Sequence, residues 1–259
     1  MGVCETLCSN EDLIRLKKLR LIDDDFMSKV FDGNIEATQL VLSIVLERKD
    51  INVISVTAQR EFKSVAGHSV RFDIFAQDSN GKPYDIEIQR ADIGASPKRA
   101  RYNNALLDSH LLNKGEDYHS LNESYVIFIT ESDVLGKGFP LYHIERMIQE
   151  TNELFDDGSH IIFVNGSYNN SENAIGKLMH DFRCTQAKDM HYSELAKKVR
   201  YFKETEGGNA AMCKIMEDMR NEQAKDTAIE IAKKMIIKGM NKEEVAELTG
   251  LSVAEIEKL

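Results

Sequence analysis

The strongest constraint on the fold is a pair of short strands joined by a tight turn, RFDIFAQDSNGKPYDIEIQ, at residues 71–89. β-Branched and aromatic residues alternate with polar residues on both sides of the turn residues DSNGK, which is typical of an antiparallel hairpin. Each strand carries an acid between large apolar residues: Asp73 follows Phe72, and Glu87 lies between two isoleucines. The side of the sheet on which the two acids lie depends on the length of the turn.

Two turn lengths are compatible with these residues. A two-residue turn places Asp73 opposite Ile88, so that Asp73 and Glu87 point to opposite faces of the sheet. A three-residue loop at residues 79–81, with a left-handed glycine at its end, places the two acids opposite each other instead. We favour the three-residue loop, because it gathers the large apolar side chains on the other face: Phe72, Ile74, Ile86 and Ile88.

Two ionised carboxylates in this arrangement repel each other unless a cation lies between them. Directly opposite residues have Cβ atoms about 4.5–5.5 Å apart, and a like charge at that distance disfavours ionisation. Oxygen ligands at this separation suit Mg²⁺ or Mn²⁺. The competing interpretation is that the polar face of an amphipathic strand is simply solvated, and alternation alone favours that interpretation.

A basic cluster follows the second acid. Ser96-Pro97 is typical of a helix start, and the helix beginning PKRARY carries most of the positive charges. On its own, such a cluster is usually a solvated helix face. Next to two carboxylates it can hold phosphate groups while a metal polarises one of them. Its candidate DNA-binding residues are Arg90, Lys98, Arg99 and Arg101, together with Tyr102, which either packs in the core or stacks on a base.

The remaining hydrophobic pattern predicts a mixed α/β fold. Asn34 is expected to cap a helix, and Ser96 begins another that ends near Leu112. The order of helix, three strands, helix and strand predicts a hairpin followed by a crossover helix into a fourth strand. The expected strands lie at residues 51–57, 69–77, 84–89, 124–130 and 160–166.

The composition limits the classes of function. Lys and Arg number 33 against 43 Asp and Glu, so the net charge of -10 repels a phosphate backbone except at a local basic patch. No apolar run approaches the roughly 18–20 residues of a membrane span. The four cysteines lack zinc-ligand spacing, so we expect reduced packing thiols and a cytoplasmic protein.

The C-terminal part is expected to be helical. A stripe containing Met212, Met216 and Met219 predicts a packing face, either within the chain or in a homodimer. The tail MNKEEVAELTGLSVAEIEKL has the outline of a helix-turn-helix. Its second helix would offer Glu255 and Glu257 to the phosphates of DNA, so a packing hairpin is favoured over a DNA reader.

The hairpin and its surroundings resemble the PD-(D/E)xK nuclease superfamily, in particular its recombination-promoting nuclease or transposase branch, the Rpn family. The similarity covers roughly residues 21–148, in the blocks DDDFMSKVF, SVRFDIFAQDSNGKPYDIEIQ, KRARYNNALLDSHLLNKGEDY and YVIFITESD. The ending GLSVAEIEKL is also similar to that branch. The resemblance implies a restriction-endonuclease-like αβββαβ core with a C-terminal helical extension, and cleavage of DNA with Mg²⁺ or Mn²⁺.

The resemblance also implies roles for individual residues. Asp73 and Glu87 correspond to the metal-binding carboxylates, and the carbonyl of Ile88 corresponds to a further ligand. Glu36 is the candidate for an accessory acid, with helix packing or solvation equally open. Gln89 occupies the position of the superfamily lysine, as is common in the Rpn branch. Its neutral amide can orient water or bind phosphate, but it cannot supply positive charge or act as a base.

We therefore expect a metal-dependent DNA endonuclease that acts as a homodimer and has no membrane segment. The alternative is a nuclease-shaped module with weak or no activity that binds DNA or assembles with other chains. Three parts are expected: an N-terminal segment at 1–18, a nuclease-like domain at 19–200 and a helical tail at 201–259.

Overall fold

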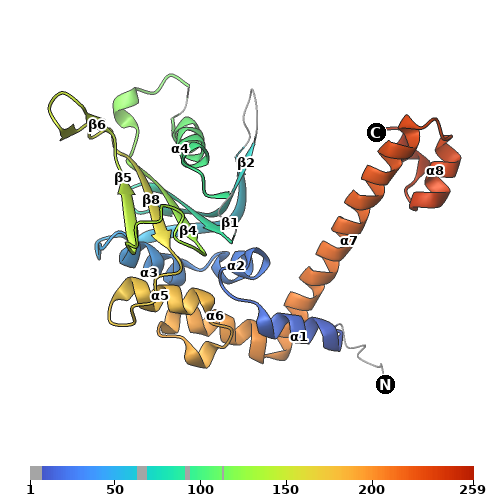
Figure 1. The fold of residues 1–259 in the computed structure, drawn as a ribbon, viewed down its shortest axis with the longest axis horizontal. Coiled ribbons are helices and arrows are strands. Elements are labelled where there is room, and N and C mark those ends of the chain that lie inside the picture. The colour runs from blue at the N-terminus through green and yellow to red at the C-terminus, as the bar shows by residue number, and fades with distance from the viewer. Residues whose placement is uncertain (1–7, 63–68, 91–93, 113) are drawn as a thin grey trace. The chain divides into compact units, whose positions relative to one another are not determined.

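The protein divides into two compact units in the computed structural model, which describes residues 8–62, 69–90, 94–112 and 114–259 (Figure 1). One unit comprises residues 18–200. The other combines the described part of residues 1–17 with residues 201–259. Helix α1 therefore belongs with the C-terminal helices. Among the described residues, no helix combines the length and the apolar character needed to cross a bilayer.

A six-stranded mixed sheet forms the centre of the 18–200 unit, in the order β1-β2-β3-β4-β8-β5. The first three strands are antiparallel, β4 and β8 run parallel to β3, and β5 is antiparallel to β8. The parallel step from β3 to β4 is made through helix α4, which confirms the predicted hairpin and crossover. The strands are β1 (Val53–Phe62), β2 (Val70–Asp78), β3 (Pro83–Gln89), β4 (Ser124–Thr130), β5 (Leu141–Ile144) and β8 (Ser159–Asn165).

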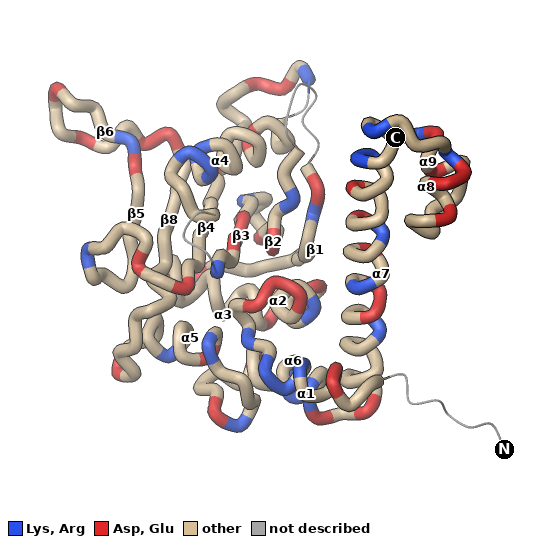
Figure 2. Tube along the Cα trace, turned by 45° about the vertical axis from the view of Figure 1, so that its right-hand side comes forward, with Lys and Arg blue, Asp and Glu red and all other residues tan. Residues whose placement is uncertain are grey.

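Helices cover both faces of this sheet. Helix α4 lies over one face, and α2, α3 and α5 lie over the other (Figures 1 and 2). The predicted helix starts are confirmed, because Asn34 accepts a hydrogen bond from the backbone of Ala37 and Ser96 accepts one from Arg99. The helices of this unit are α2 (Asp24–Phe31), α3 (Ile35–Val45), α4 (Pro97–Leu111) and α5 (Ala174–Arg183), with short 3₁₀ turns at Tyr118–Ser120 and Ala187–Asp189.

The segment between β4 and β8 contains structure that the hydrophobic pattern does not predict. Besides β5, it forms a separate two-stranded sheet from β6 (Met147–Ile148) and β7 (Glu153–Leu154). These strands are very short and their residues are exposed. They therefore lack the alternating burial that makes a strand recognisable in a sequence.

The other unit is helical. The predicted tail hairpin packs on α7, because Val245, Leu251 and Ile256 are buried against Ala232. Gly250 ends the first helix of the hairpin in the left-handed conformation, with φ of 72°. The helices are α1 (Asn10–Lys18), α7 (Glu206–Ile237), α8 (Lys242–Thr249) and α9 (Val253–Ile256), while α6 (Ser193–Glu204) spans the residues at which the two units divide.

The structure corrects the expectation about the cysteines and refines the one about the methionine stripe. Cys8 and Cys213 form a disulfide with a Cα–Cα distance of 5.4 Å, so the expectation of reduced thiols is wrong for this pair. The two cysteines are 205 residues apart in sequence, and spacing rules for local motifs do not detect such a pair. Cys4 lies outside the described residues. Of the methionine stripe, Met212 and Met216 are buried within the chain.

Candidate active site: buried carboxylates at the hairpin

The β2–β3 hairpin has the three-residue loop. Ile74 pairs with Ile86 and Phe75 with Asp85, and the backbone N–H of Asp78 donates to the carbonyl of Lys82 at 3.1 Å. The loop ends at Gly81 in the left-handed conformation, with φ of 80°. This confirms the three-residue loop. One residue beyond the last pair, Asp73 and Glu87 lie on neighbouring strands, and each side chain accepts a hydrogen bond from the backbone of the other strand.

Both acids are buried. Asp73 is 9% exposed and Glu87 is fully buried, so the interpretation of a solvated polar face is wrong. The cause is the position of β3, which lies between β2 and β4 and has helices over both faces. A carboxylate in such a place needs hydrogen bonds or a cation to compensate for lost hydration.

Backbone N–H groups supply part of that compensation. Oδ2 of Asp73 accepts a hydrogen bond from the N–H of Ile88 at 2.9 Å. Oε1 of Glu87 accepts one from the N–H of Asp73 at 3.4 Å. Each carboxylate thus reaches across to the neighbouring strand, and these two hydrogen bonds hold the side chains near each other.

The pKa values show that this compensation is incomplete. Burial, with a smaller contribution from the negative charge of Asp24, raises the pKa of Asp73 to about 6. Burial and the negative charge of Asp73 raise the pKa of Glu87 to about 7. Both acids resist ionisation mainly because they are buried, and a bound cation would stabilise their charged forms.

A third buried acid, Asp85, lies two residues before Glu87 on β3. Its Oδ2 accepts a hydrogen bond from Nδ2 of Asn103 at 3.2 Å, while Oδ1 of Asp85 and Oδ1 of Asn103 have no partner among the described residues. Burial and the nearby Glu87 raise the pKa of Asp85 well above its usual value. The period of two along YDIEIQ could have identified this acid, but its partner on α4 could not be read from the sequence.

A polar side chain lies on the other flank of Asp73. In the β1–β2 register Ala58 pairs with Ile74 and Arg60 with Phe72, so Gln59 lies opposite Asp73. Gln59 has a φ of 54° inside a strand, an unusual conformation for a residue with a side chain. Its Nε2 lies 3.5 Å from Oδ1 of Asp73 and 3.2 Å from Oδ1 of Asp24. Gln59 therefore links the carboxylate pair to an acid on α2.

The structure does not bring Glu36 to this pair. The carboxylate of Glu36 is 69% exposed and lies 3.2 Å from Nζ of Lys197 on α6. Asp24, which the sequence analysis missed, is the acid of the helical layer that contacts the site, through Gln59. The run Asp23–Asp25 marks this segment as acidic, and Figure 2 shows acidic residues along α2 and β3.

The basic residues divide into two groups. Nη2 of Arg99 lies 2.5 Å from Oε2 of Glu87, so Arg99 is part of the buried site. Nη1 of Arg90 lies 3.3 Å from Oδ1 of Asp23. Lys98 and Arg101 are exposed on the first turns of α4, and the ring of Tyr102 is 42% exposed beside them.

Gln89 lies next to Arg99. A Cβ atom built on Gly94 would come within 1.9 Å of Oε1 of Gln89 and 3.3 Å of Nη1 of Arg99. The amide of Gln89 and the guanidinium of Arg99 therefore both pack against the backbone of Gly94, where only glycine leaves room. Ile88, whose carbonyl is a predicted ligand, is 5% exposed between Glu87 and Gln89.

The oxygen donors of this site fit a hard divalent cation. Asp73, Glu87 and the carbonyl of Ile88 provide carboxylate and carbonyl oxygens, which Mg²⁺ and Mn²⁺ prefer. Burial raises the pKa of both carboxyls because their charged forms lose hydration, and a cation would compensate for that loss. When bound, the ion would lower the pKa of a water molecule and polarise a phosphate oxygen.

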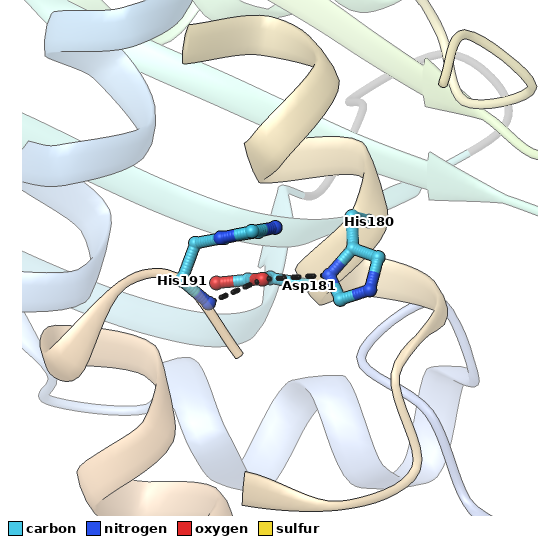
Figure 3. A group of neighbouring side chains, drawn as sticks. All are labelled: His180, Asp181 and His191. Atoms are coloured by element: carbon cyan, nitrogen blue, oxygen red, sulfur yellow. Dashed lines mark hydrogen bonds and ion pairs between the residues drawn. The ribbon is translucent and has the colours of Figure 1, made fainter. Parts of the chain in front are cut away.

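A second group of potential ligands combines His180 and Asp181 of α5 with His191, which precedes α6 (Figure 3). Asp181 is fully buried, and its two oxygens accept the backbone N–H groups of His191 and Tyr192 at 2.8 Å each. Its Oδ1 also lies 3.2 Å from Nδ1 of His180. The Asp181 carboxylate thus holds the turn before α6 in place, which is sufficient reason for its burial.

Comparison with known proteins agrees with this geometry. Residues 29–249 match the protein family described as PD-(D/E)XK nuclease family transposase. No match was found among curated proteins or among solved structures. The family match extends from α2 to the end of α8 and includes every acid of the β2–β3 hairpin. It confirms the resemblance of the sequence to PD-(D/E)xK nucleases, and the chain belongs to the PD-(D/E)XK nuclease family of transposases.

Proposed function

We propose that the protein is a metal-dependent DNA endonuclease of the recombination-promoting type, the Rpn branch. The observation that carries this proposal is the buried pair of acids, Asp73 and Glu87, which hydrogen bonds between β2 and β3 hold close together. A nuclease needs such a pair to hold the metal ion that activates water for attack on a phosphodiester. The family of the chain supports the same chemistry at a coarser level.

In this proposal each residue has a defined task. Asp73, Glu87 and the carbonyl of Ile88 hold Mg²⁺ or Mn²⁺. Asp24 takes the accessory role expected of Glu36, since it contacts Asp73 through Gln59. Lys98 and Arg101 contact the DNA backbone, together with Arg90 and Tyr102 at the edges of the same surface.

Plasmid cleavage tests the proposal. The purified protein is expected to nick supercoiled plasmid with Mg²⁺ or Mn²⁺ and to lose this activity with a chelator. Asp73→Asn and Glu87→Gln should each reduce nicking by about 100-fold or more, because even the partners of metal ligands contribute 10- to 100-fold. Asp50→Asn is the matched control, since Asp50 is an exposed acid that pairs with Arg48 in a loop. Equal nicking by all four proteins would indicate a contaminating nuclease and contradict the proposal.

A second candidate function is a nuclease-shaped module that binds DNA or assembles as a homodimer without cleaving. The observation in its favour is the neutral amide of Gln89 beside the acids, where it can supply neither charge nor a base. This module would bind DNA equally well in the wild type and in Asp73→Asn, and neither protein would nick plasmid at any metal concentration.

A further inference from the structure

Arg99 contacts Glu87, one of the three buried acids. Nη2 of Arg99 lies 2.5 Å from Oε2 of the fully buried Glu87. Among the described residues, no other ion pair reaches Asp73, Asp85 or Glu87. The positive charge of Arg99 opposes the effect of burial on Glu87, since it lowers the pKa that burial raises.

The backbone around Arg99 is fixed, while the end of its side chain is accessible. Arg99 lies in the first turn of α4, where its N–H donates to the capping Oγ of Ser96 at 3.2 Å, and the next residue, Ala100, is fully buried. The side chain is 35% exposed, and Nη1 donates to the carbonyl of Gly94 at 3.2 Å. The guanidinium is thus at the boundary between the buried acids and solvent.

Two cations cannot share Glu87 without repelling each other. A divalent ion held by Asp73 and Glu87 would lie close to the guanidinium, which contacts the same carboxylate. The guanidinium can move outward on its flexible stem, whereas the strand residues cannot. A planar guanidinium is also well suited to bind a phosphate group in two places at once.

We propose that Arg99 is a displaceable counter-ion of this site: it neutralises Glu87 when no metal is bound, competes with the divalent ion, and then binds the phosphate that is cleaved. This inference rests on the proposed nuclease function and gives a residue of α4 a catalytic role, because the guanidinium would contact the cleaved phosphate. It also supplies a positive charge close to Gln89, which has none.

The test uses two measurements that should change in opposite directions. At a pH well above 7, where Glu87 is ionised in both proteins, Arg99→Gln should bind Mn²⁺ about tenfold more tightly or better in a calorimetric titration. The guanidinium and the metal compete for the same carboxylate, and the charge of an adjacent arginine is worth about 1–3 pKa units to that carboxylate. At saturating Mn²⁺ the same variant should nick plasmid about 100-fold more slowly, the effect typical of losing one stabilising group. A purely structural role for Arg99 would lower both values.

Two further variants make the result decisive. Arg99→Lys keeps the charge and should retain weak Mn²⁺ binding close to that of the wild type, with cleavage between the wild type and Arg99→Gln. Arg101→Gln, which removes an exposed arginine of the same helix, should leave the Mn²⁺ affinity unchanged in the absence of DNA. Equal or weaker Mn²⁺ binding by Arg99→Gln would overturn this inference and leave the nuclease proposal intact if the wild type nicks plasmid. Absence of both binding and nicking in the wild type would instead reject the nuclease proposal.

Discussion

At the scale of single residues, the buried acids make the stability of the metal-free protein depend on pH. The pKa of Asp73 is about 6 and that of Glu87 is about 7 in the folded protein, whereas carboxyl groups in unfolded chains titrate near 4. The folded protein therefore holds more protons than the unfolded chain between about pH 4 and pH 7. Its free energy of unfolding should fall as the pH rises through this range.

Asp73→Asn isolates the contribution of one acid. The variant removes a group that must ionise in the folded protein, and it also relieves the repulsion of Glu87. Urea unfolding without metal measures the free energy of unfolding at pH 5 and at pH 8. This free energy should fall less between the two pH values for the variant than for the wild type. A loss as large as that of the wild type would show that Asp73 does not carry this pH dependence.

Variants of Asp24 and Glu36 test which of these two acids has the accessory role in cleavage. Asp24→Asn should reduce plasmid nicking by about tenfold, since Asp24 acts on Asp73 through Gln59 in the way that outer partners of metal ligands act. Glu36→Gln should have little effect, because Glu36 pairs with Lys197 on an exposed surface. The initial rate of nicking at fixed Mn²⁺ measures both. A loss confined to Glu36→Gln would restore the assignment based on the sequence.

At the scale of elements, the hairpin loop determines whether the acids meet. Gly81 has a φ of 80°, and a residue with a Cβ atom pays about 1–2 kcal/mol in that conformation. Gly81→Ala should therefore lower the free energy of unfolding by about that amount. Chemical unfolding measures this change, with Gly33→Ala as a comparison at another left-handed glycine in an open position. No loss of stability would mean that the loop does not have the left-handed end.

The elements also show what could be predicted from the sequence. The period of two in RFDIF and YDIEIQ and the turn residues of DSNGK determine the hairpin locally, so its register was predictable. The strand at residues 124–130 was found with the same bounds as β4 because its residues are continuously apolar.

Contacts between distant segments were not predictable from patterns within one segment. Asp24 and Gln59 approach Asp73 from two other elements. Arg99 was expected to bind DNA, but its first contact is with Glu87. The Cys8–Cys213 disulfide likewise joins segments that no local spacing connects.

At the scale of the whole molecule, the charge distribution limits how DNA can be held. The net charge of -10 repels a phosphate backbone, and two members of the basic cluster, Arg90 and Arg99, are paired with acids of the protein. Lys98 and Arg101 remain as the exposed basic residues of this helix turn. Binding of DNA is therefore expected to depend on the metal ion, which lowers the negative charge at the site.

The free energy of unfolding of the whole chain can be used to measure metal binding at the site of Asp73 and Glu87. A ligand that binds only the folded protein raises the free energy of unfolding, by about 2.7 kcal/mol at 100 times its dissociation constant. Mn²⁺ at such a concentration should stabilise the wild type by that amount and should leave Asp73→Asn and Glu87→Gln unchanged. Urea unfolding at pH 8 with and without Mn²⁺ makes the measurement on the intact chain. Equal stabilisation of the wild type and both variants, or none in the wild type, would contradict the claim that the two opposed acids form a metal site.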